Sequence, residues 1–565
     1  MFLRETKRRV ANGAAISYYQ LAENVWNPQT QRPETRIVYN FGRVDDTTRE
    51  RLRRLARSIL RRASPEEILA ADPAFILENA WPHGGLYVLE ALWDRLGLRE
   101  VVARCVHEEH SRAPLERALF AMVANRSLAP RSKLYCYEQW LREEVYFPAG
   151  AALDLQHLYR AMDLLEKHHE TIEREVFWRT CDLLQAQVDL IFYDTTTLHC
   201  EIAEEDEQAS RGNRAAGRRR YPALRRFGHS KNGRDDVPQV VVGLAVTREG
   251  LPVRCWIFPG NTVDVTTVEQ VKADLRGWQL GRCVFVGDAG MVSAENLDHL
   301  AAGGGRYLVG TRLKAGDEVT TRVINRPGRY RLVRENLRVK EVWVPHRDAG
   351  ERRRRYVVCF NPQEAERQRQ HRARVVVLLE GELAALERAG TDHPKRACEL
   401  MASLRFRPYL RQLQGGRLRL DRRAIREAAR YDGKFVVTSN DDTLTAEDLA
   451  LGYKQLLRVE QSWRELKSGL RVRPMFHWVA HRIHAHVRLS VLSLLLERVA
   501  EQACQDTWRN IRDRLESLKV AVFRTPHGRL VQTSELRPET RKVLNQLKIP
   551  PPPLILEATW GGGRA

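Results

Sequence analysis

Residues 188–312 follow a strict order of strand-like and helix-like segments. Three strand-like segments come first, VDLIFYDTTTLHC, QVVVGLAV and LPVRCWIF, and the turn TREG joins the second to the third as a hairpin. A helix with Asp264 as its expected N-cap follows, and then the strand RCVFVGDAG, the helix MVSAENLDHLAAGG and the strand RYLVGTRL. Three strands in a meander, followed by alternating helix and strand, predict one mixed α/β sheet.

Helical periodicity dominates the residues that precede this sheet. Residues 15–42 are expected to form a β-hairpin, Asp45–Arg62 a helix, and Ser64 the N-cap of a further helix with Pro65 in its first position. Helical spacing continues over residues 84–185. We therefore expect an α/β protein with an RNase H-like mixed-sheet core and a mostly helical N-terminal region.

Short amphipathic strands recur between residues 313 and 435, together with a charged helix near 363–390, and we interpret this segment as a β-rich insertion into the sheet domain. One long helix, LTAEDLALGYKQLLRVEQSWRELKSG, and a second, VAHRIHAHVRLSVLSLLLERVAEQA, follow it. The expected divisions are 1–185 for the N-terminal region, 186–312 for the first part of the core, 313–435 for the insertion, 436–500 for the closing helices and 501–565 for a C-terminal helical segment and tail.

The net charge indicates the kind of partner. The 565 residues carry 93 Lys+Arg against 72 Asp+Glu, a formal charge of +21, and 43% of them are hydrophobic, which suffices for a sizeable core. A polyanion, most simply nucleic acid, is the expected partner. The sequence contains no GxxxxGK[ST], which argues against a P-loop motor.

Short segments of the sequence argue against several other classes of protein. The longest apolar stretch, Leu489–Leu496, contains two serines, so we expect no membrane span. The N-terminal MFLRETKRRV lacks an apolar region and is not expected to be a signal peptide. Nine cysteines without a C-x-x-C pair argue against a zinc ribbon and favour reduced thiols, and hence the cytoplasm.

Two aspartates stand where buried strands end. Asp194 follows an apolar strand and precedes three threonines, and Asp288 ends the strand CVFVG. Acids in such positions point into the crevice beside the sheet, where substrates of open α/β sheets bind. The sequence leaves a plainer interpretation open for each: Asp194 could bond to local backbone, and Asp288 could cap the turn before Gly290.

A third acid belongs to the long helix after the insertion. Tyr453, Glu460 and Lys467 are seven residues apart, and seven steps of ~100° fall about 20° short of two turns, so the three form one stripe on a continuous helix. The alternative is a solvated stripe in which Glu460 pairs with Arg464.

Two strand aspartates and a helix glutamate form a donor set suited to two Mg²⁺ or Mn²⁺ ions, because both ions prefer hard oxygen ligands. Two such ions about 4 Å apart activate an attacking oxygen and stabilise a leaving oxygen at a phosphodiester. Nearby arginines would hold the DNA backbone.

The chain resembles the DDE transposases of bacterial insertion sequences, in the branch with a Tyr–Arg–Glu–Lys signature helix. The resemblance covers nearly the whole chain and is strongest in LIFYDTTTL, GLAVTREGLPVRCWIFPGNTVD, VFVGDAGM and YKQLLRVEQSWRELKSGLRVRPMFH. It implies that the catalytic, metal-binding acids are Asp194, Asp288 and Glu460, and that the family's Tyr and Lys are Tyr453 and Lys467.

One position departs from the family pattern. The family's arginine falls at Leu456, and we consider Lys454 and Arg458 as possible substitutes for its phosphate contact. Further DNA contacts are expected from the loop 211–234, which contains many arginines and few acids. Its basic residues are Arg211, Arg214, Arg218, Arg219, Arg220, Arg225, Arg226, Lys231 and Arg234.

Four histidines and one tryptophan are further candidates for a functional role. His477 and His481 have a metal-ligand spacing, but no other ligand is obvious, so a basic surface facing phosphate is the preferred interpretation of the cluster that they form with His484 and His486. Trp343 could stack on an unpaired base, although packing is the better expectation.

The sequence therefore predicts a transposase that binds terminal inverted repeats through its N-terminal region and insertion, cleaves the element ends and joins the 3′-OH to target DNA. Its partners would be double-stranded DNA and at least one further copy of the chain when two ends are paired, in the bacterial cytoplasm with the nucleoid. The alternatives are an RNase H-like structure-selective nuclease and a domesticated DNA-binding protein with an inactive site.

Overall fold

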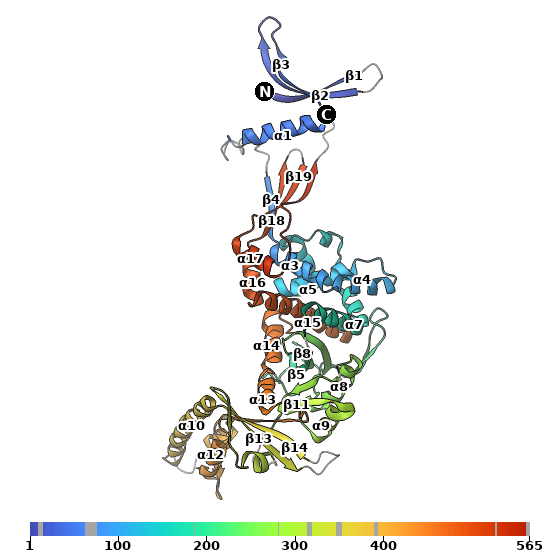
Figure 1. Ribbon diagram of the computed structural model, residues 1–565. Coiled ribbons are helices and arrows are strands. Elements are labelled where there is room, and N and C mark those ends of the chain that lie inside the picture. Colours follow the sequence, from blue (N-terminus) through green and yellow to red (C-terminus); the bar gives the residue numbers. More distant parts are fainter. Residues whose placement is uncertain are drawn as a thin grey trace. The chain divides into compact units, whose positions relative to one another are not determined.

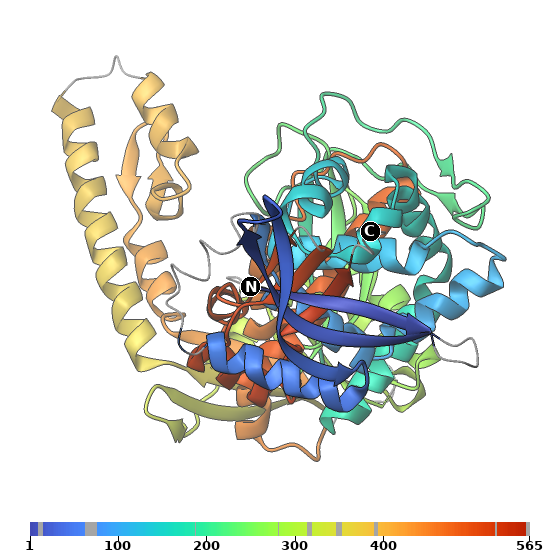
Figure 2. The same cartoon turned by 90° about the horizontal axis from the view of Figure 1, so that it is seen from above.

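The computed structural model describes residues 1–9, 15–60, 62, 76–186, 188–280, 282–313, 319–345, 353–388, 394–525 and 528–560. The chain forms two compact units. The terminal unit comprises Met1–Ala80, Val520–Ser534 and Pro553–Ala565, and the main unit comprises Trp81–Lys519 and Glu535–Pro552. Figure 1 and Figure 2 show the chain in two views.

The terminal unit contains two small antiparallel sheets. The hairpin predicted for residues 15–42 is confirmed as β2 (Ala15–Asn27) and β3 (Arg32–Arg43), and β1 (Phe2–Arg9) adds a third strand that the charged sequence does not indicate. Helix α1 (Asp46–Leu60) follows, whereas the helix expected from Ser64 lies outside the described residues. The second sheet has the order β20-β19-β18-β4, with β4 Ile76–Pro82, β18 Lys519–Thr525, β19 Gly528–Thr533 and β20 Ile555–Trp560.

Strands β18–β20 correct the expectation that residues 501–565 form only a helical segment and a tail. Much of the segment consists of α16 (Trp508–Leu515), β18, β19 and α17 (Pro538–Gln546). Strand β18 pairs with β4, more than 400 residues earlier in the chain. Short strands whose partner lies so far away leave no local periodicity for the sequence to reveal.

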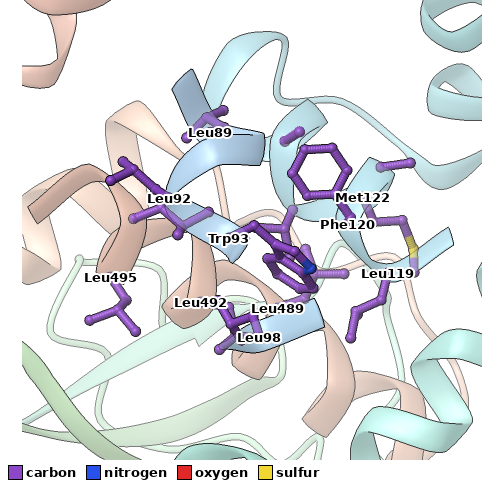
Figure 3. Close-up of a cluster of buried hydrophobic side chains, with 14 of the residues drawn as sticks. Leu89, Leu92, Trp93, Leu98, Leu119, Phe120, Met122, Leu489, Leu492 and Leu495 are labelled. Atoms are coloured by element: carbon purple, nitrogen blue, oxygen red, sulfur yellow. The ribbon is translucent and has the colours of Figure 1, made fainter. Parts of the chain in front are cut away.

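A helical bundle forms one part of the main unit. Its core contains Trp93, Phe120 and Leu492, which are fully or almost fully buried (Figure 3). Helix α15 packs against α5 and α7, and most of its residues are buried, including the charged Arg488 and Glu497. The helices are α3 Gly84–Arg95, α4 Leu98–Glu108, α5 Leu115–Leu128, α6 Lys133–Tyr135, η1 Cys136–Glu144, η2 Pro148–Ala152, α7 Leu155–Leu184 and α15 Ala480–Cys504.

No helix within the described part of the chain, α15 included, combines the length and apolar character that crossing a membrane requires.

A nine-stranded mixed sheet forms the other part of the main unit, as the strand and helix order predicts. Its order is β12-β13-β14-β17-β11-β10-β5-β8-β9, in which β5, β8 and β9 form the expected meander and β10 and β11 run parallel to β5. The strands are β5 Leu190–His199, β8 Gln239–Thr247, β9 Pro252–Pro259, β10 Val284–Gly287, β11 Arg306–Thr311, β12 Arg331–Arg334, β13 Leu337–Pro345, β14 Arg353–Phe360 and β17 Lys434–Ser439.

Both faces of the sheet are buried at β5. Successive residues of this strand point to opposite faces, and each set packs in a different hydrophobic cluster. Ile191 and Tyr193 pack in the cluster that includes residues of α8 (Val268–Gly277) and α9 (Ala294–Ala301). Leu190 and Phe192 pack in the cluster that includes residues of α15, α13 (Ala446–Lys454) and α14 (Leu457–Arg464). The shorter elements of this region are β6 Ser210–Arg211, β7 Arg220–Tyr221, η3 Asp264–Thr267, η4 Ala289–Met291 and η5 Ala302–Gly304.

The segment 313–435 is not predominantly β. Strands β12, β13 and β14 extend the large sheet, and the long helix α10 (Pro362–Arg388) then leads into a helical region, where Figure 2 shows it beside the segment that follows it. The remaining elements are η6 Val319–Ile324, α11 Pro394–Ala402, η7 Arg407–Tyr409, β15 Leu410–Gln412, β16 Leu418–Leu420 and α12 Arg422–Ala429.

The single long helix expected over residues 444–469 is interrupted. Helix α13 (Ala446–Lys454) begins at a Thr445 capping box, and α14 (Leu457–Arg464) starts after a tight turn and continues into the π-helical η8 (Glu465–Gly469). At the turn, backbone amides bond to carbonyls three residues back instead of four, and Leu456 is drawn into the core.

Candidate active site

Asp194 and Asp288 lie side by side at the centre of the large sheet. Strands β5 and β10 are parallel, with Tyr193 opposite Gly287, so the next residue of each strand is an aspartate. Burial raises the pKa of Asp194 to about 6, and the nearby carboxylates of Asp288 and Asp264 act in the same direction. The two acids thus lie next to each other, but only Asp288 follows the end of its strand: Asp194 lies within β5, which continues to His199.

Tyr453 reaches this site from α13. Its hydroxyl donates a hydrogen bond to Asp288 Oδ1 at 3.2 Å, and its ring stacks on Phe435. Burial, followed by the charge of Asp288, raises the pKa of Tyr453, so the hydroxyl stays protonated as a donor. Gly310 permits this approach, because a Cβ there would clash with Tyr453 Oη and lie 2.9 Å from Cζ.

Glu460 lies on α14, which packs against β5. Its carboxylate is exposed and close enough to Tyr453 to contribute to the raised pKa of the tyrosine hydroxyl. Among the described residues, the carboxylates of this site do not bring three oxygens all within 4.8 Å of one another. The donor set nevertheless fits hard divalent cations, since it consists of carboxylate oxygens and includes a half-buried aspartate next to further acids.

Lys467 approaches from the η8 end of the same region. Its ammonium donates to Asn232 Oδ1 at 3.1 Å. Burial lowers the pKa of Lys467 to about 8, while the Asp194 carboxylate opposes that shift. Tyr453 therefore contacts Asp288, Lys467 lies near Asp194, and Glu460 lies near Tyr453, even though the helix that carries them is not continuous.

Lys231 and Asp264 add a second pair of charges. Lys231 Nζ lies 2.8 Å from Asp264 Oδ2 and 4.0 Å from Asp194 Oδ1, and it also donates to the carbonyl and hydroxyl oxygens of Thr195. The Thr195 hydroxyl donates to the other oxygen of Asp264. Lys231, expected to contact DNA, is thus held among the acids of the site.

Asp264 belongs to this site, although its sequence pattern predicts only a helix cap. The expectation that it caps a helix is wrong: α8 has Thr267 at its N-cap, and the Asp264 carboxylate bonds to Lys231 and Thr195 instead. A weak signal existed, because Asp264 lies in the segment that follows β9, the third strand of the meander.

The two suggested substitutes for the family's arginine lie elsewhere. Arg458 donates to Gln461 and lines a cavity with Arg464, Glu465 and Trp508. Lys454 lies near Cys359 of β14: burial raises the pKa of that thiol, and the charge of Lys454 acts in the opposite direction. Leu456 itself is buried in the core.

Several basic side chains of the loop 211–234 form ion pairs or hydrogen bonds with other residues of the protein. Arg225 pairs with Asp206, Arg226 with Glu205, and Arg234 with Glu201 and Asp236, while Arg219 lies beside the His169 ring. Four arginines remain exposed, with no ion pair to another described residue: Arg211, Arg214, Arg218 and Arg220.

The histidine cluster is not a basic surface, and that expectation is wrong. Burial lowers the pKa of His477 to about 3 and holds the pKa values of His484 and His486 well below 6.5, so these rings are neutral. His481 packs against Asp163, with Nε2 and Oδ1 3.3 Å apart. Trp343 lies on β13, 36% exposed, with the Arg355 guanidinium 5.7 Å from its ring centroid.

Comparison with known proteins identifies the family. The model of the transposase DDE domain matches residues 194–496, more than half of the chain, and its match begins at Asp194. The chain therefore belongs to the DDE transposases. The model of the N-terminal domain of IS1634 family transposases matches residues 3–72. The protein is an insertion-sequence transposase, a metal-dependent enzyme that binds and cleaves DNA.

One solved structure, the cryo-EM structure of a piggyBac transposase synaptic complex with hairpin DNA, matches 82% of this chain and 79% of its own at 8% identity and a TM-score of 0.32. A likeness at that score supports no inference about fold or function. No curated protein matches the chain.

Proposed function

We propose that Asp194, Asp288 and Glu460 are the catalytic acids of this transposase and bind two Mg²⁺ or Mn²⁺ ions in an RNase H-like core. The observation that carries the proposal is the adjacency of Asp194 and Asp288 on parallel central strands, with Tyr453 of the signature helix bonded to Asp288. The strand order β9-β8-β5-β10-β11, three antiparallel strands followed by two parallel ones, supports the assignment of the core.

The ions would supply Lewis-acid activation of the attacking and leaving oxygens of the phosphodiester. The protein's own groups orient this chemistry. Tyr453 fixes one carboxylate oxygen of Asp288 and leaves the other free. Lys467 places a positive charge beside Asp194, where it can hold a scissile phosphate. Lys231 neutralises the acids until cations bind.

The remaining surfaces would bind and pair the DNA ends. We assign 1–185 to binding of the terminal inverted repeats together with the insertion 313–435, 186–312 and 436–500 to catalysis, and 501–565 to a C-terminal segment. Arg218 and Arg220 are free to contact phosphates, whereas Arg219 and Arg234 would first have to leave their present partners. Joining two ends implies at least a dimer on DNA.

Carboxamide variants test the catalytic assignment. Asp194→Asn, Asp288→Asn and Glu460→Gln should each lower end cleavage and strand transfer by at least 100-fold while gel shifts with end DNA stay unchanged, because base and phosphate contacts lie outside the acids. Glu295→Gln, on the exposed face of α9, is the matched control. Lys467→Ala should lower cleavage with Mn²⁺ binding unchanged. Wild-type cleavage in any of the three acid variants would remove that acid from the site.

Cleavage without joining would identify a nuclease instead. Pre-cut ends with a free 3′-OH, incubated with supercoiled target DNA and Mg²⁺, should give joined products with the wild-type protein. Absence of joined products from a protein that cleaves ends would contradict the transposition reaction.

A further inference from the structure

Two large aromatic side chains project from the segment that joins η8 to α15. Phe476 is 70% exposed and Trp478 is 71% exposed. Tryptophan and phenylalanine are among the side chains whose exposure costs most, so neighbouring exposed rings indicate a binding surface. The catalytic groups described above do not use either ring.

The backbone around the two rings is firmly held. The Val472 amide bonds to Leu466 O at 2.9 Å, and the Met475 amide bonds to His199 O, the last residue of β5, at 3.1 Å. Met475 is buried, and α15 starts immediately after Val479. The rings of Phe476 and Trp478 are therefore presented to solvent by an ordered segment.

One face of Trp478 is already supported by a cation. The Arg225 guanidinium lies 5.0 Å from the Trp478 ring centroid, and its Nε donates to Asp206 at 2.9 Å. The salt bridge fixes the arginine, and the arginine fixes the ring. The exposure of Trp478 leaves its other face open, as a stacking platform requires.

Positive charge connects this pair of rings to the catalytic site. Arg473 contributes to the lowered pKa of Lys467, so it lies near the lysine that approaches Asp194. Arg471 is exposed, and neither arginine has an ion pair with another described residue. Along the chain, both arginines lie between Lys467 and the two rings of Phe476 and Trp478.

We propose that Phe476 and Trp478 form a base-stacking surface for the unpaired DNA strand that extends from the cleavage site over Lys467 and Arg473. The partner is DNA with unstacked bases, because bases supply π-faces and the backbone supplies the phosphates that the two free arginines require. This proposal rests on the proposed function of the carboxylate site.

Forked end DNA with 2-aminopurine in its unpaired arm tests the proposal. Anisotropy gives the Kd without divalent metal, and 2-aminopurine emission reports stacking. Phe476→Ala and Trp478→Ala should each weaken binding of the fork roughly tenfold and raise the emission, and leave binding of the fully paired end nearly unchanged. Trp478→Phe should restore most of the affinity. Leu554→Ala, which removes an exposed apolar side chain of the terminal unit, is the control.

Equal affinity of wild type and both alanine variants for the fork would overturn the proposal. So would a change of oligomeric state in these variants, measured by light scattering, with DNA binding intact, since the rings would then contact protein. Asp194→Asn should bind and stack the fork as wild type does. If Asp194→Asn instead cleaves normally while the alanine variants lose stacking, the catalytic assignment fails and the stacking surface stands.

Discussion

Lys231 places a positive charge among carboxylates that would otherwise repel one another. It is 2.8 Å from Asp264 and 4.0 Å from Asp194, and burial already raises the pKa of Asp194 to about 6. A divalent cation at Asp194 therefore has to compete with the ammonium. We regard Lys231 as a counter-ion of the metal-free site and Asp264 as the acid that keeps the lysine there.

Replacing Lys231 by methionine should strengthen metal binding. Removal of the competing charge, at a distance of 4.0 Å, is expected to lower the Kd for Mn²⁺ about tenfold in the absence of DNA. Titration calorimetry measures this directly. Lys542→Met, at an exposed position of α17, should leave the Kd unchanged. A weaker Kd in Lys231→Met would show that the lysine organises the acids instead of competing with the metal.

Gly310 and Tyr453 should be coupled. A Cβ at position 310 would meet the Tyr453 hydroxyl, so Gly310→Ala is expected to push the ring away from Asp288 and to lower end cleavage about tenfold or more. In a Tyr453→Phe background the oxygen is absent, and the additional effect of Gly310→Ala should be smaller. Cleavage rates of the two single variants and the double variant form the cycle that measures this. Strictly additive effects would exclude a contact between these residues.

At the level of single elements, the broken helix α13–α14 changes how the signature residues reach the site. Tyr453 comes from α13, Glu460 from α14 and Lys467 from the π-helical η8. Leu456 lies in the turn between α13 and α14 and is buried, so the position that carries an arginine in the family serves packing here. Because the three side chains lie on three short elements, each can point toward the site in its own direction. A straight helix would place all three side chains along one line.

Helix α15 contains a carboxyl group that burial forces to stay neutral. Glu497 is 1% exposed, its Oε2 has no hydrogen-bond partner among the described residues, and the charges of Glu465 and Glu501 add to the effect of burial in raising its pKa well above 4.5. The native state therefore holds a proton that the unfolded chain releases as the pH rises above about 4.5, and stability falls with increasing pH.

Glu497→Gln should remove that part of the pH dependence. Glutamine resembles the protonated carboxyl group, so the variant and wild type should be similar in stability at pH 5, and the variant should become more stable as pH rises, by up to ~1.4 kcal/mol per unit. Thermal midpoints between pH 5 and pH 8 measure the difference. A constant difference across this range would mean that Glu497 is ionised in the native state.

At the scale of the whole molecule, the terminal and main units differ in how much hydrophobic core they contain. The hydrophobic cores of the large sheet and of the helical bundle consist of main-unit residues. Strands β1–β3 bury few hydrophobic side chains, and Ala22 is the one hydrophobic residue in the described part of these strands that is fully buried. Apart from Phe2, the strands β1–β3 also lie within the match to the N-terminal transposase domain.

Deleting residues 1–43 should leave the main unit folded. Its thermal midpoint is expected to change by no more than about 2 °C, because the deleted strands contribute almost nothing to the main cores. Binding of terminal DNA should weaken at least tenfold, since basic groups of the N-terminal region are lost. Circular dichroism and gel shifts measure the two effects. Unchanged binding of end DNA would move the contact to another part of the chain.

The sequence alone determined which segments form β5, β8, β9, β10 and β11 of the central sheet, because burial imposes a short local period on strands and helices, and it singled out Asp194 and Asp288 on those strands. The family motif pointed to Tyr453, Glu460 and Lys467 as well. Only the tertiary structure decided that Asp264 and Lys231 join these residues, that Arg458 and Lys454 do not, and that the histidines are buried. Those outcomes depend on desolvation and on pairing between segments far apart in the chain, as for β4 with β18, and no local pattern encodes them.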